Sequence, residues 1–354
     1  MGTLTIPSSL TDVTTGWLSD ALGVPVRSFE PELIGEGVGL MGELTRLHLT
    51  YDIGGEGPAS VILKLPSSHP ENRAVACHYR FYEREAAFYR ELASRVNVKV
   101  PSCHYLDADV SADRYVLLLE DLGHLRLGDQ VEGASLADAE AALDLLATLH
   151  ATWWDHPLLD ELAWMPDICD PINKAAQANY QQVWPLFVER FGHLLDADEL
   201  AMGQAVGHRY AELFDIAHGR PLTVVHGDAR LDNMLFDESG RPTIIDWQIT
   251  TKGRTGYFDV VYFLGGSVDP ELRRREGARL LADYDAVLAS RGVAPLPEDE
   301  RLEAMRVAAL VCLLYPVIGG STDLANERGV RLAERMTRGY FGLATELDAM
   351  QVLG

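Results

Sequence analysis

Basic side chains are scarce in this sequence of 354 residues. There are 30 Lys and Arg residues against 53 Asp and Glu residues, which gives a formal net charge of −23 at pH 7. Nucleic acids and anionic membrane surfaces attract proteins through basic patches, so the composition argues against both as partners. The charge would suit a cationic or neutral substrate, but overall acidity mainly favours solubility and does not identify one.

Cysteines are also few, and neither a leader nor a long apolar run is visible. Cys77, Cys103, Cys169 and Cys312 form no CxxC pair and show no metal-ligand spacing. We interpret them as reduced thiols, most simply as small buried apolar side chains. Residues 1–6 lack the basic and apolar regions of a signal peptide, and we find no run of membrane-spanning length. These absences predict a soluble, cytoplasmic protein without a membrane partner.

What the sequence does contain is a strand-rich first part and a helical remainder. Apolar alternation and β-branched runs predict strands at 33–34, 44–51, 61–65, 105–110 and 114–120, with one helix at 80–96. Beyond Gly123, helices are expected near 135–150, 174–191, 197–218, 257–264, 271–290 and 301–315, with short strands at 223–225, 234–236 and 243–246. This change of pattern predicts two domains, residues 1–121 and 122–354.

The most informative segment is HGDARLDN, from His226 to Asn233, which is followed by Ile244-Ile245-Asp246-Trp247. It places Asp228 and Asn233 on one loop, with Asp246 at the end of a predicted strand. Phosphoryl transfer uses such groups, because a carboxylate orients the acceptor hydroxyl and an Asn and an Asp hold the metal ion that neutralises the phosphates. A polar loop between two strands would look similar, so the other motifs must decide.

Two earlier motifs point to the same chemistry. Gly37, Gly39 and Gly42 form a GxGxxG string between two predicted strands. In a dinucleotide-binding fold a helix would follow this string, whereas a following strand favours a loop that covers phosphates; a plain glycine hairpin is the alternative. Lys64 ends the run Val-Ile-Leu-Lys in the next strand, which is similar to the VAIK pattern of kinases. A lysine with apolar neighbours needs a polar partner, which nucleotide phosphates would supply.

Taken together and in this order, the motifs resemble the protein-kinase-like fold in the form found in aminoglycoside phosphotransferases and choline kinase-like small-molecule kinases. The resemblance covers about residues 30–265. It implies an α+β, two-lobed fold, with a small, mainly antiparallel β lobe that carries one helix and a larger, mostly helical second lobe. It also implies ATP and Mg²⁺ as cofactors and a small-molecule hydroxyl as the acceptor of the phosphate.

The resemblance further implies how the first lobe would bind the nucleotide. Lys64 would hold the phosphates beneath the glycine loop and would itself be positioned by a glutamate of the helix at 80–96. Glu85 is the favoured partner, and Glu83 is the open alternative. The segment that ends in Glu120 and Leu122 resembles the interlobe hinge, whose backbone groups would read the adenine edge.

For the second lobe, the resemblance implies that Asp228 orients the acceptor hydroxyl and accepts its proton. Arg230 would contact the transferring phosphate, although a solvated loop arginine is an equal alternative. Asn233 and Asp246 would bind Mg²⁺. Asp259 resembles a family aspartate that braces the catalytic loop from a helix.

Two departures separate the chain from protein kinases. Gly227 replaces the arginine of their catalytic loop, and little room for an activation segment follows Asp246. Both favour a small acceptor, whose identity stays open. The segment between the predicted hinge and the catalytic loop, roughly residues 123–225, is longer than in protein kinases and would bind the acceptor. Its acidic residues would suit an aminoglycoside, and its tryptophans would suit an apolar alcohol (Asp155, Asp160, Glu161, Asp167 and Asp170; Trp153, Trp154, Trp164 and Trp184). A catalytically silent nucleotide-binding scaffold is the alternative function, and the intact set of catalytic groups argues against it.

Overall fold

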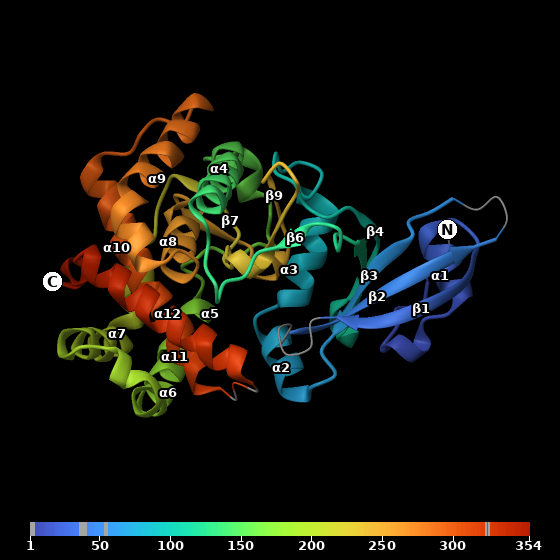
Figure 1. The fold of residues 1–354 in the computed structure, drawn as a ribbon, viewed down its shortest axis with the longest axis horizontal. Helices are drawn as coiled ribbons and strands as arrows, with labels where there is room; N and C mark the ends of the chain where they lie inside the picture. Colours follow the sequence, from blue (N-terminus) through green and yellow to red (C-terminus); the bar gives the residue numbers. More distant parts are fainter. Residues whose placement is uncertain (1–3, 35–40, 53–55, 323, 325) are drawn as a thin grey trace. The chain divides into compact units, whose positions relative to one another are not determined.

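The computed structural model describes residues 4–34, 41–52, 56–322, 324 and 326–354, which fold into two compact units (Figure 1). Unit 1 consists of residues 1–125 and 245–249, and unit 2 consists of residues 126–244 and 250–354. The sequence pattern gave no sign that the short segment Ile245–Ile249 belongs with unit 1.

Unit 1 is built on an antiparallel sheet with the strand order β1-β2-β3-β5-β4. Its strands are β1 (Val26–Ile34), β2 (Gly42–Tyr51), β3 (Ser60–Pro66), β4 (Cys103–Asp109) and β5 (Arg114–Glu120). Side chains alternate across a strand, so Leu63 and Leu65 enter an apolar core with Trp17 and Leu18. Lys64 therefore points to the opposite face of the sheet.

In the described part of unit 1, three α-helices accompany this sheet, where the sequence predicted one. They are α1 (Thr15–Leu22), α2 (Pro70–His78) and α3 (Phe81–Ala87), which continues into a π-helical turn at Phe88–Leu92. Two local features define α1, because the Thr14 hydroxyl caps its first turn and Gly23 ends it with a φ of +72°. The helix predicted at 80–96 corresponds to α3 and its π-helical extension. Both α1 and α2 were missed because they are short.

Unit 2 contains short strands that hold its loops. β7 (Leu222–Val225) pairs with β10 (Thr251–Arg254), and β8 (Met234–Phe236) lies between β6 (Arg126–Leu127) and β9 (Pro242–Ile244). The segment His226–Asn233 thus connects the end of β7 to the start of β8. Both of its ends are fixed by strand pairing.

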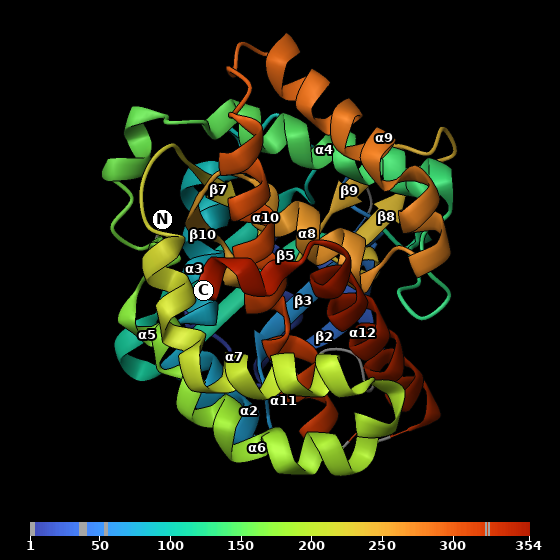
Figure 2. The ribbon, with the colours of Figure 1, turned by 90° about the vertical axis from the view of Figure 1, so that its left-hand side faces the viewer.

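The remainder of unit 2 is helical. Its helices are α4 (Leu136–Trp153), α5 (Pro171–Lys174), α6 (Ala176–Phe191), α7 (Ala197–Ile216), α8 (Tyr257–Gly266), α9 (Pro270–Ser290), α10 (Glu298–Cys312), α11 (Leu314–Ser321) and α12 (Glu327–Glu346). Every residue of α8 is buried, and the helix packs against α4, α9, α10 and α12 (Figure 2). Polar side chains on such a helix must find partners inside the protein. Asp259 and Tyr262 are two of them.

Two expectations drawn from the sequence need correction. The stretch Glu298–Ser321 is long and apolar enough to pass as a membrane span by length and composition, so such a run does exist. More than half of it is buried within the protein, as in an ordinary core helix, so it is weak evidence of a span. All four cysteines are free thiols, but only Cys312 is fully buried and Cys77 is exposed.

Candidate active site

A largely buried cluster of three charged side chains lies in unit 1. The Lys64 ammonium group is 2.8 Å from the Glu85 carboxylate and 2.7 Å from the Asp246 carboxylate. Lys64 comes from β3, Glu85 from α3, and Asp246 from the segment that joins unit 1 late in the chain. Residues far apart in the sequence thus meet around one cation.

The electrostatics of this cluster keep the lysine charged. Burial by itself would lower the pKa of Lys64, but the carboxylates of Asp246 and Glu85 outweigh it and raise the pKa above its usual value. Glu85 is almost fully buried. Both of its carboxylate oxygens lie 2.8 Å from the Lys64 ammonium nitrogen, and Oε2 also accepts a hydrogen bond of 2.7 Å from the hydroxyl of Tyr115. Glu85 is therefore held in place from two sides.

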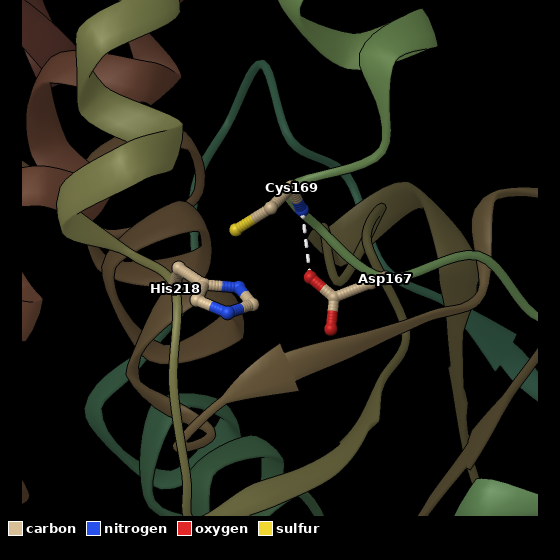
Figure 3. Close-up of side chains that lie close together, drawn as sticks. All are labelled: Asp167, Cys169 and His218. Atoms are coloured by element: carbon tan, nitrogen blue, oxygen red, sulfur yellow. Dashed lines mark hydrogen bonds between the residues drawn. The ribbon is translucent and has the colours of Figure 1, made fainter.

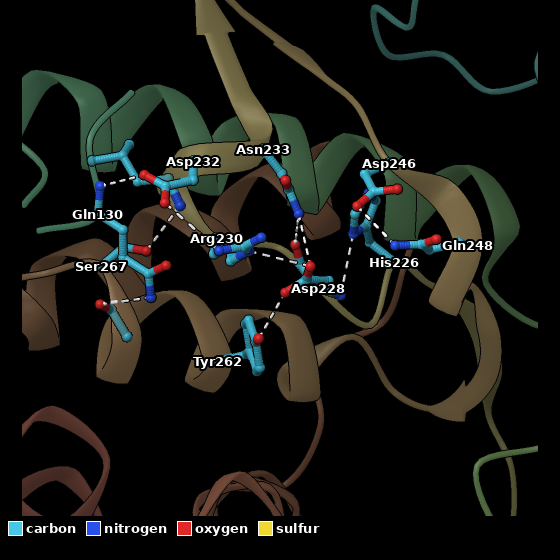
Figure 4. A network of polar contacts seen from close by, with 12 residues as sticks. Gln130, His226, Asp228, Arg230, Asp232, Asn233, Asp246, Gln248, Tyr262 and Ser267 are labelled. Atoms are coloured by element: carbon cyan, nitrogen blue, oxygen red, sulfur yellow. Dashed lines mark hydrogen bonds and ion pairs between the residues drawn. The ribbon is translucent and has the colours of Figure 1, made fainter. Parts of the chain in front are cut away.

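Asp246 is positioned by the backbone that carries it. It has a φ of +66°, a conformation that Asp tolerates better than most residues. Its neighbour Trp247 stacks on Phe88 with ring centroids 3.9 Å apart, and the Arg84 guanidinium donates to the carbonyl of Ile249 at 2.7 Å. These contacts attach the segment to α3 and the turn after it. Gln248 donates to the other Asp246 oxygen at 3.0 Å (Figure 4).

The two candidate partners of Lys64 have different environments. Glu83 lies on a different face of α3 from Glu85. Its carboxylate is 2.6 Å from the Arg80 guanidinium, and both side chains are partly exposed. Glu85 points inward, and it is the glutamate that contacts Lys64. The side chain of Arg84, between them, is buried.

The residues predicted to cover the nucleotide are only partly described. Gly37 and Gly39 lie outside the described residues. Gly42 begins β2, and a Cβ atom there would lie 3.2 Å from the Leu65 carbonyl oxygen and 3.5 Å from Cε of Lys64. A side chain at position 42 would therefore crowd the lysine.

The predicted hinge follows β5. The N–H of Glu120 donates to the Ser102 carbonyl at 2.8 Å, so this group is already used. The Leu122 carbonyl accepts from the N–H of Leu125 at 2.9 Å, and within the described part of the chain no hydrogen bond engages the N–H of Leu122.

In unit 2, the loop after β7 is held by α8. The two carboxylate oxygens of Asp259 accept the backbone N–H groups of His226, at 2.7 Å, and Gly227, at 2.9 Å. Gly227 has a φ of +85°, which favours glycine at this turn. Asp259 thus braces the loop from a helix, as predicted from the resemblance.

A second layer supports Asp259. His150 of α4 lies 3.1 Å from the Asp259 carboxylate through Nε2 and 2.8 Å from the Tyr284 hydroxyl through Nδ1, and all three residues are buried. His150 is thus a member of a buried polar chain that the sequence did not reveal.

The Asp228 side chain is surrounded by donors. Tyr262 of α8 donates its hydroxyl to Oδ1 at 2.7 Å, and Oδ2 accepts from the Asn233 amide at 2.9 Å and from Arg230 Nε at 3.2 Å (Figure 4). Arg230 also lies 3.6 Å from the carboxylate of Asp232. The structure therefore brings together Asp228, Arg230 and Asn233, all three of which were singled out from the sequence.

Asn233 has an orientation that matters for metal binding. Its amide nitrogen donates to both the backbone carbonyl and the side chain of Asp228, at 2.9 Å each. The amide oxygen is then the atom that remains to act as a ligand.

The sequence missed Tyr262 as a partner of Asp228. A signal was present, since Tyr262 follows Asp259 by three positions on a predicted helix and the two must share a face. It also missed Asp232, whose buried carboxylate accepts from the N–H of Gln130, at 2.7 Å, and from Arg328, at 3.2 Å.

The sequence model of the ecdysteroid kinase-like family matches residues 36–292, well over half of the chain. No curated protein matches the sequence.

Solved structures with a similar fold include a choline kinase from Cryptosporidium parvum (TM-score 0.56, 12% identity, 92% of this chain and 91% of that chain) and the choline kinase LicA from Streptococcus pneumoniae (0.54, 15%, 94% and 97%). Another is a Ralstonia eutropha protein assigned to the aminoglycoside phosphotransferases (0.54, 16%, 94% and 97%). At these identities the likeness concerns the fold, which is protein-kinase-like and confirms the predicted fold class. The chain belongs to the ecdysteroid kinase-like family.

Proposed function

We propose that the protein transfers the γ-phosphate of ATP, in the presence of Mg²⁺, to a hydroxyl group of a small molecule. Its family relation to small-molecule kinases supports a kinase. The observation that supports phosphate transfer from ATP is the largely buried contact of Lys64 with both Glu85 and Asp246. Burying one cation and two carboxylates is costly and seldom improves stability over apolar packing, so a functional reason for the cluster is favoured.

In this proposal Lys64 binds the nucleotide phosphates. Glu85 is fixed by Tyr115 and keeps the ammonium group in place, while Asp246 is the more exposed of the two carboxylates. Asp246 is thus the carboxylate that can turn to a metal ion when phosphate oxygens contact Lys64. For the adenine edge, the open N–H of Leu122 is the donor we propose, because the N–H of Glu120 is already used.

Mg²⁺ would be held by Asn233 and Asp246. Magnesium prefers oxygen ligands and usually combines one or two protein groups with phosphates and water. The amide oxygen of Asn233 and the carboxylate of Asp246 offer such ligands, so the residues present fit the ion. The ion would neutralise charge on the transferring phosphate.

Asp228 would orient the acceptor hydroxyl and take its proton. Tyr262 and Asn233 hold its carboxylate through different oxygens, which restricts its rotation. A phosphoryl transfer with a loose transition state needs mainly this positioning of the nucleophile. Arg230 can turn from Asp228 to the transferring phosphate, a role that stays a proposal.

The acceptor is proposed only as a small-molecule alcohol, since the structure reduces the support for both narrower options. Trp153 and Trp164 are buried in unit 2, and Trp184 stacks on Tyr180, so these rings are occupied by packing. Two of the acidic candidates, Asp155 and Asp160, pair with Arg220.

The test is a screen of small alcohols with ATP and Mg²⁺, read by mass spectrometry as the gain of a phosphate. Asp228→Asn serves as the inactive variant, and Asp144→Asn, which changes an exposed carboxylate on α4, is the matched control. We expect a product with the unchanged protein and with the control only. Nucleotide binding without turnover on any alcohol in a broad panel would favour the silent scaffold instead.

A further inference from the structure

Outside the candidate active site, three side chains of different chemistry converge within unit 2. Asp167 and Cys169 belong to the turn that precedes α5, and His218 follows the end of α7 (Figure 3). One ligand atom from each lies within 4.8 Å of the others. The sulfur of Cys169 and a carboxylate oxygen of Asp167 lie beside the His218 ring in Figure 3.

The turn that carries two of these groups is firmly held. The N–H of Ile168 donates to the Lys252 carbonyl in β10 at 2.8 Å, and the Asn173 amide donates to the Ile168 carbonyl at the same distance. The Asp167 carboxylate itself accepts the N–H of Cys169 at 2.8 Å. The aspartate and the cysteine are thus presented together by a fixed backbone.

The third group is placed differently. His218 is exposed and follows α7 by two residues, so its ring can rotate. The Cys169 thiol donates to the Phe214 carbonyl in the last turn of α7 at 2.8 Å. The two segments, about fifty residues apart in the sequence, are therefore already in contact at this point.

We propose that Asp167, Cys169 and His218 bind a divalent transition-metal ion of the zinc type. Thiolate, imidazole and carboxylate together are ligands of Zn²⁺ and similar ions, whereas Mg²⁺ takes oxygen ligands. Tetrahedral bonds of about 2.0–2.3 Å would place the ligand atoms roughly 3.5 Å apart. A movement of about one ångström, mostly by His218, would close the present arrangement.

Charge and protons balance in this site. The ion replaces the proton of the Cys169 thiol, which leaves to solvent as the metal–sulfur bond forms and the hydrogen bond to Phe214 is lost. One thiolate and one carboxylate then neutralise the two charges of the ion. Water would fill the fourth position, on the exposed side near His218.

The proposed metal site adjoins the strands that lead to the catalytic loop. Only three residues separate His218 from β7, which ends directly before His226, and β10 pairs with both β7 and the turn at Asp167. A bound ion would join these segments and stabilise unit 2. Metal binding at this site and its effect on stability do not require phosphoryl transfer.

The test is a titration of the full chain with Co²⁺, then with Zn²⁺, in excess Mg²⁺ and a phosphine reductant. We expect one ion per chain, a thiolate-to-cobalt charge-transfer band that Zn²⁺ abolishes, and a melting temperature raised by Zn²⁺. Cys169→Ser should remove the band, and His218→Ala should weaken binding at least about tenfold, the smallest effect typical even of outer-shell changes.

Cys77→Ser and His193→Ala are the matched controls, since both change exposed side chains elsewhere. Each should bind like the unchanged protein. The proposal fails if no charge-transfer band forms, if the band persists in Cys169→Ser, or if several weak ions bind without a change in melting temperature. Because His218 is exposed, its variant should fold normally, which circular dichroism would verify.

Discussion

The two units hold their candidate catalytic groups in different ways. In unit 1, Lys64, Glu85 and Asp246 form a cluster of full charges that is mostly buried. In unit 2, Asp228 is surrounded chiefly by neutral donors, namely Tyr262 and Asn233, with Arg230 at a longer distance. Removing one member of a buried charge cluster leaves the others uncompensated, whereas removing one neutral hydrogen bond costs much less. A substitution in the charge cluster of unit 1 should therefore lower both stability and turnover, whereas a substitution around Asp228 in unit 2 should lower mainly turnover.

The largest combined effect is expected from Lys64→Ala. It leaves the Glu85 and Asp246 carboxylates without their shared cation, and such a loss typically costs about 3–5 kcal/mol of stability. ATP-dependent turnover should also fall to background, because the phosphates lose their fixed cation. Urea unfolding and a turnover assay would measure both, and Lys99→Ala, at an exposed position of unit 1, is the control.

A double variant sharpens this test. Lys64→Met with Glu85→Gln removes opposite charges together, so most of the stability should return while turnover stays absent. Recovery of turnover along with stability would show that Lys64 matters only for folding.

The second-largest expected effect is the loss of turnover rate in Asp228→Asn. General-base contributions are typically on the order of 10²–10⁴ in rate, and we expect a loss in that range with ATP affinity little changed. Stability should fall only by about 1–2 kcal/mol, because the new amide group faces donors such as Tyr262. Single-turnover kinetics would measure the rate, and nucleotide titration would measure the ATP affinity.

Asp246→Asn is the informative comparison for Asp228→Asn. As the proposed metal ligand, it should weaken Mg²⁺-nucleotide binding as well as rate. If the two variants had the same profile, the separate roles of base and metal ligand would be wrong.

A smaller effect is expected from Tyr262→Phe. The change removes one hydrogen bond to Asp228, worth about 1 kcal/mol in stability, and lets the carboxylate rotate. We expect kcat to fall by roughly tenfold, equivalent to about 1.4 kcal/mol, with little change in KM for ATP.

Tyr340→Phe is the matched control for this prediction. It also removes a buried tyrosine hydroxyl, which donates to the Tyr262 carbonyl at 3.2 Å without contacting Asp228. Equal losses of kcat in both variants would assign the effect to packing around α8 rather than to the orientation of Asp228.

The sequence predicted most of the fold because its patterns are local. Apolar alternation and β-branched runs predicted β2, β3 and β5, and helical periodicity predicted α4, α6, α7, α9 and α10 to within a few residues. The resemblance added the fold class and the loop around Asp228. Short elements such as α1 were missed because eight residues carry little periodic signal.

The arrangement of Asp246 could not be predicted in the same way. Its place in unit 1 depends on the stacking of Trp247 on Phe88 and on the bond from Arg84 to Ile249. These contacts join residues about 160 positions apart, and nothing in the local sequence marks them. The convergence of Cys169 and His218 escaped the sequence for the same reason, since no regular spacing relates them.

The smallest effect is expected from Glu83→Gln, which completes the comparison within unit 1. Glu83 pairs with Arg80 at a distance of 2.6 Å, with side-chain exposures of 26% and 45%. Such surface pairs contribute about 0–1 kcal/mol, so stability and turnover should both change little. Glu85→Gln carries the same chemical change two residues later, but there it removes the buried charge that faces Lys64 and that the Tyr115 hydroxyl contacts. We expect that variant to lose several-fold in ATP affinity and measurable stability, while Glu83→Gln stays within error of the unchanged protein in nucleotide titration and urea unfolding. If Glu83→Gln were instead the variant that lost ATP affinity, the positioning role would belong to the outer glutamate, and the inward pair of Lys64 and Glu85 would be only structural.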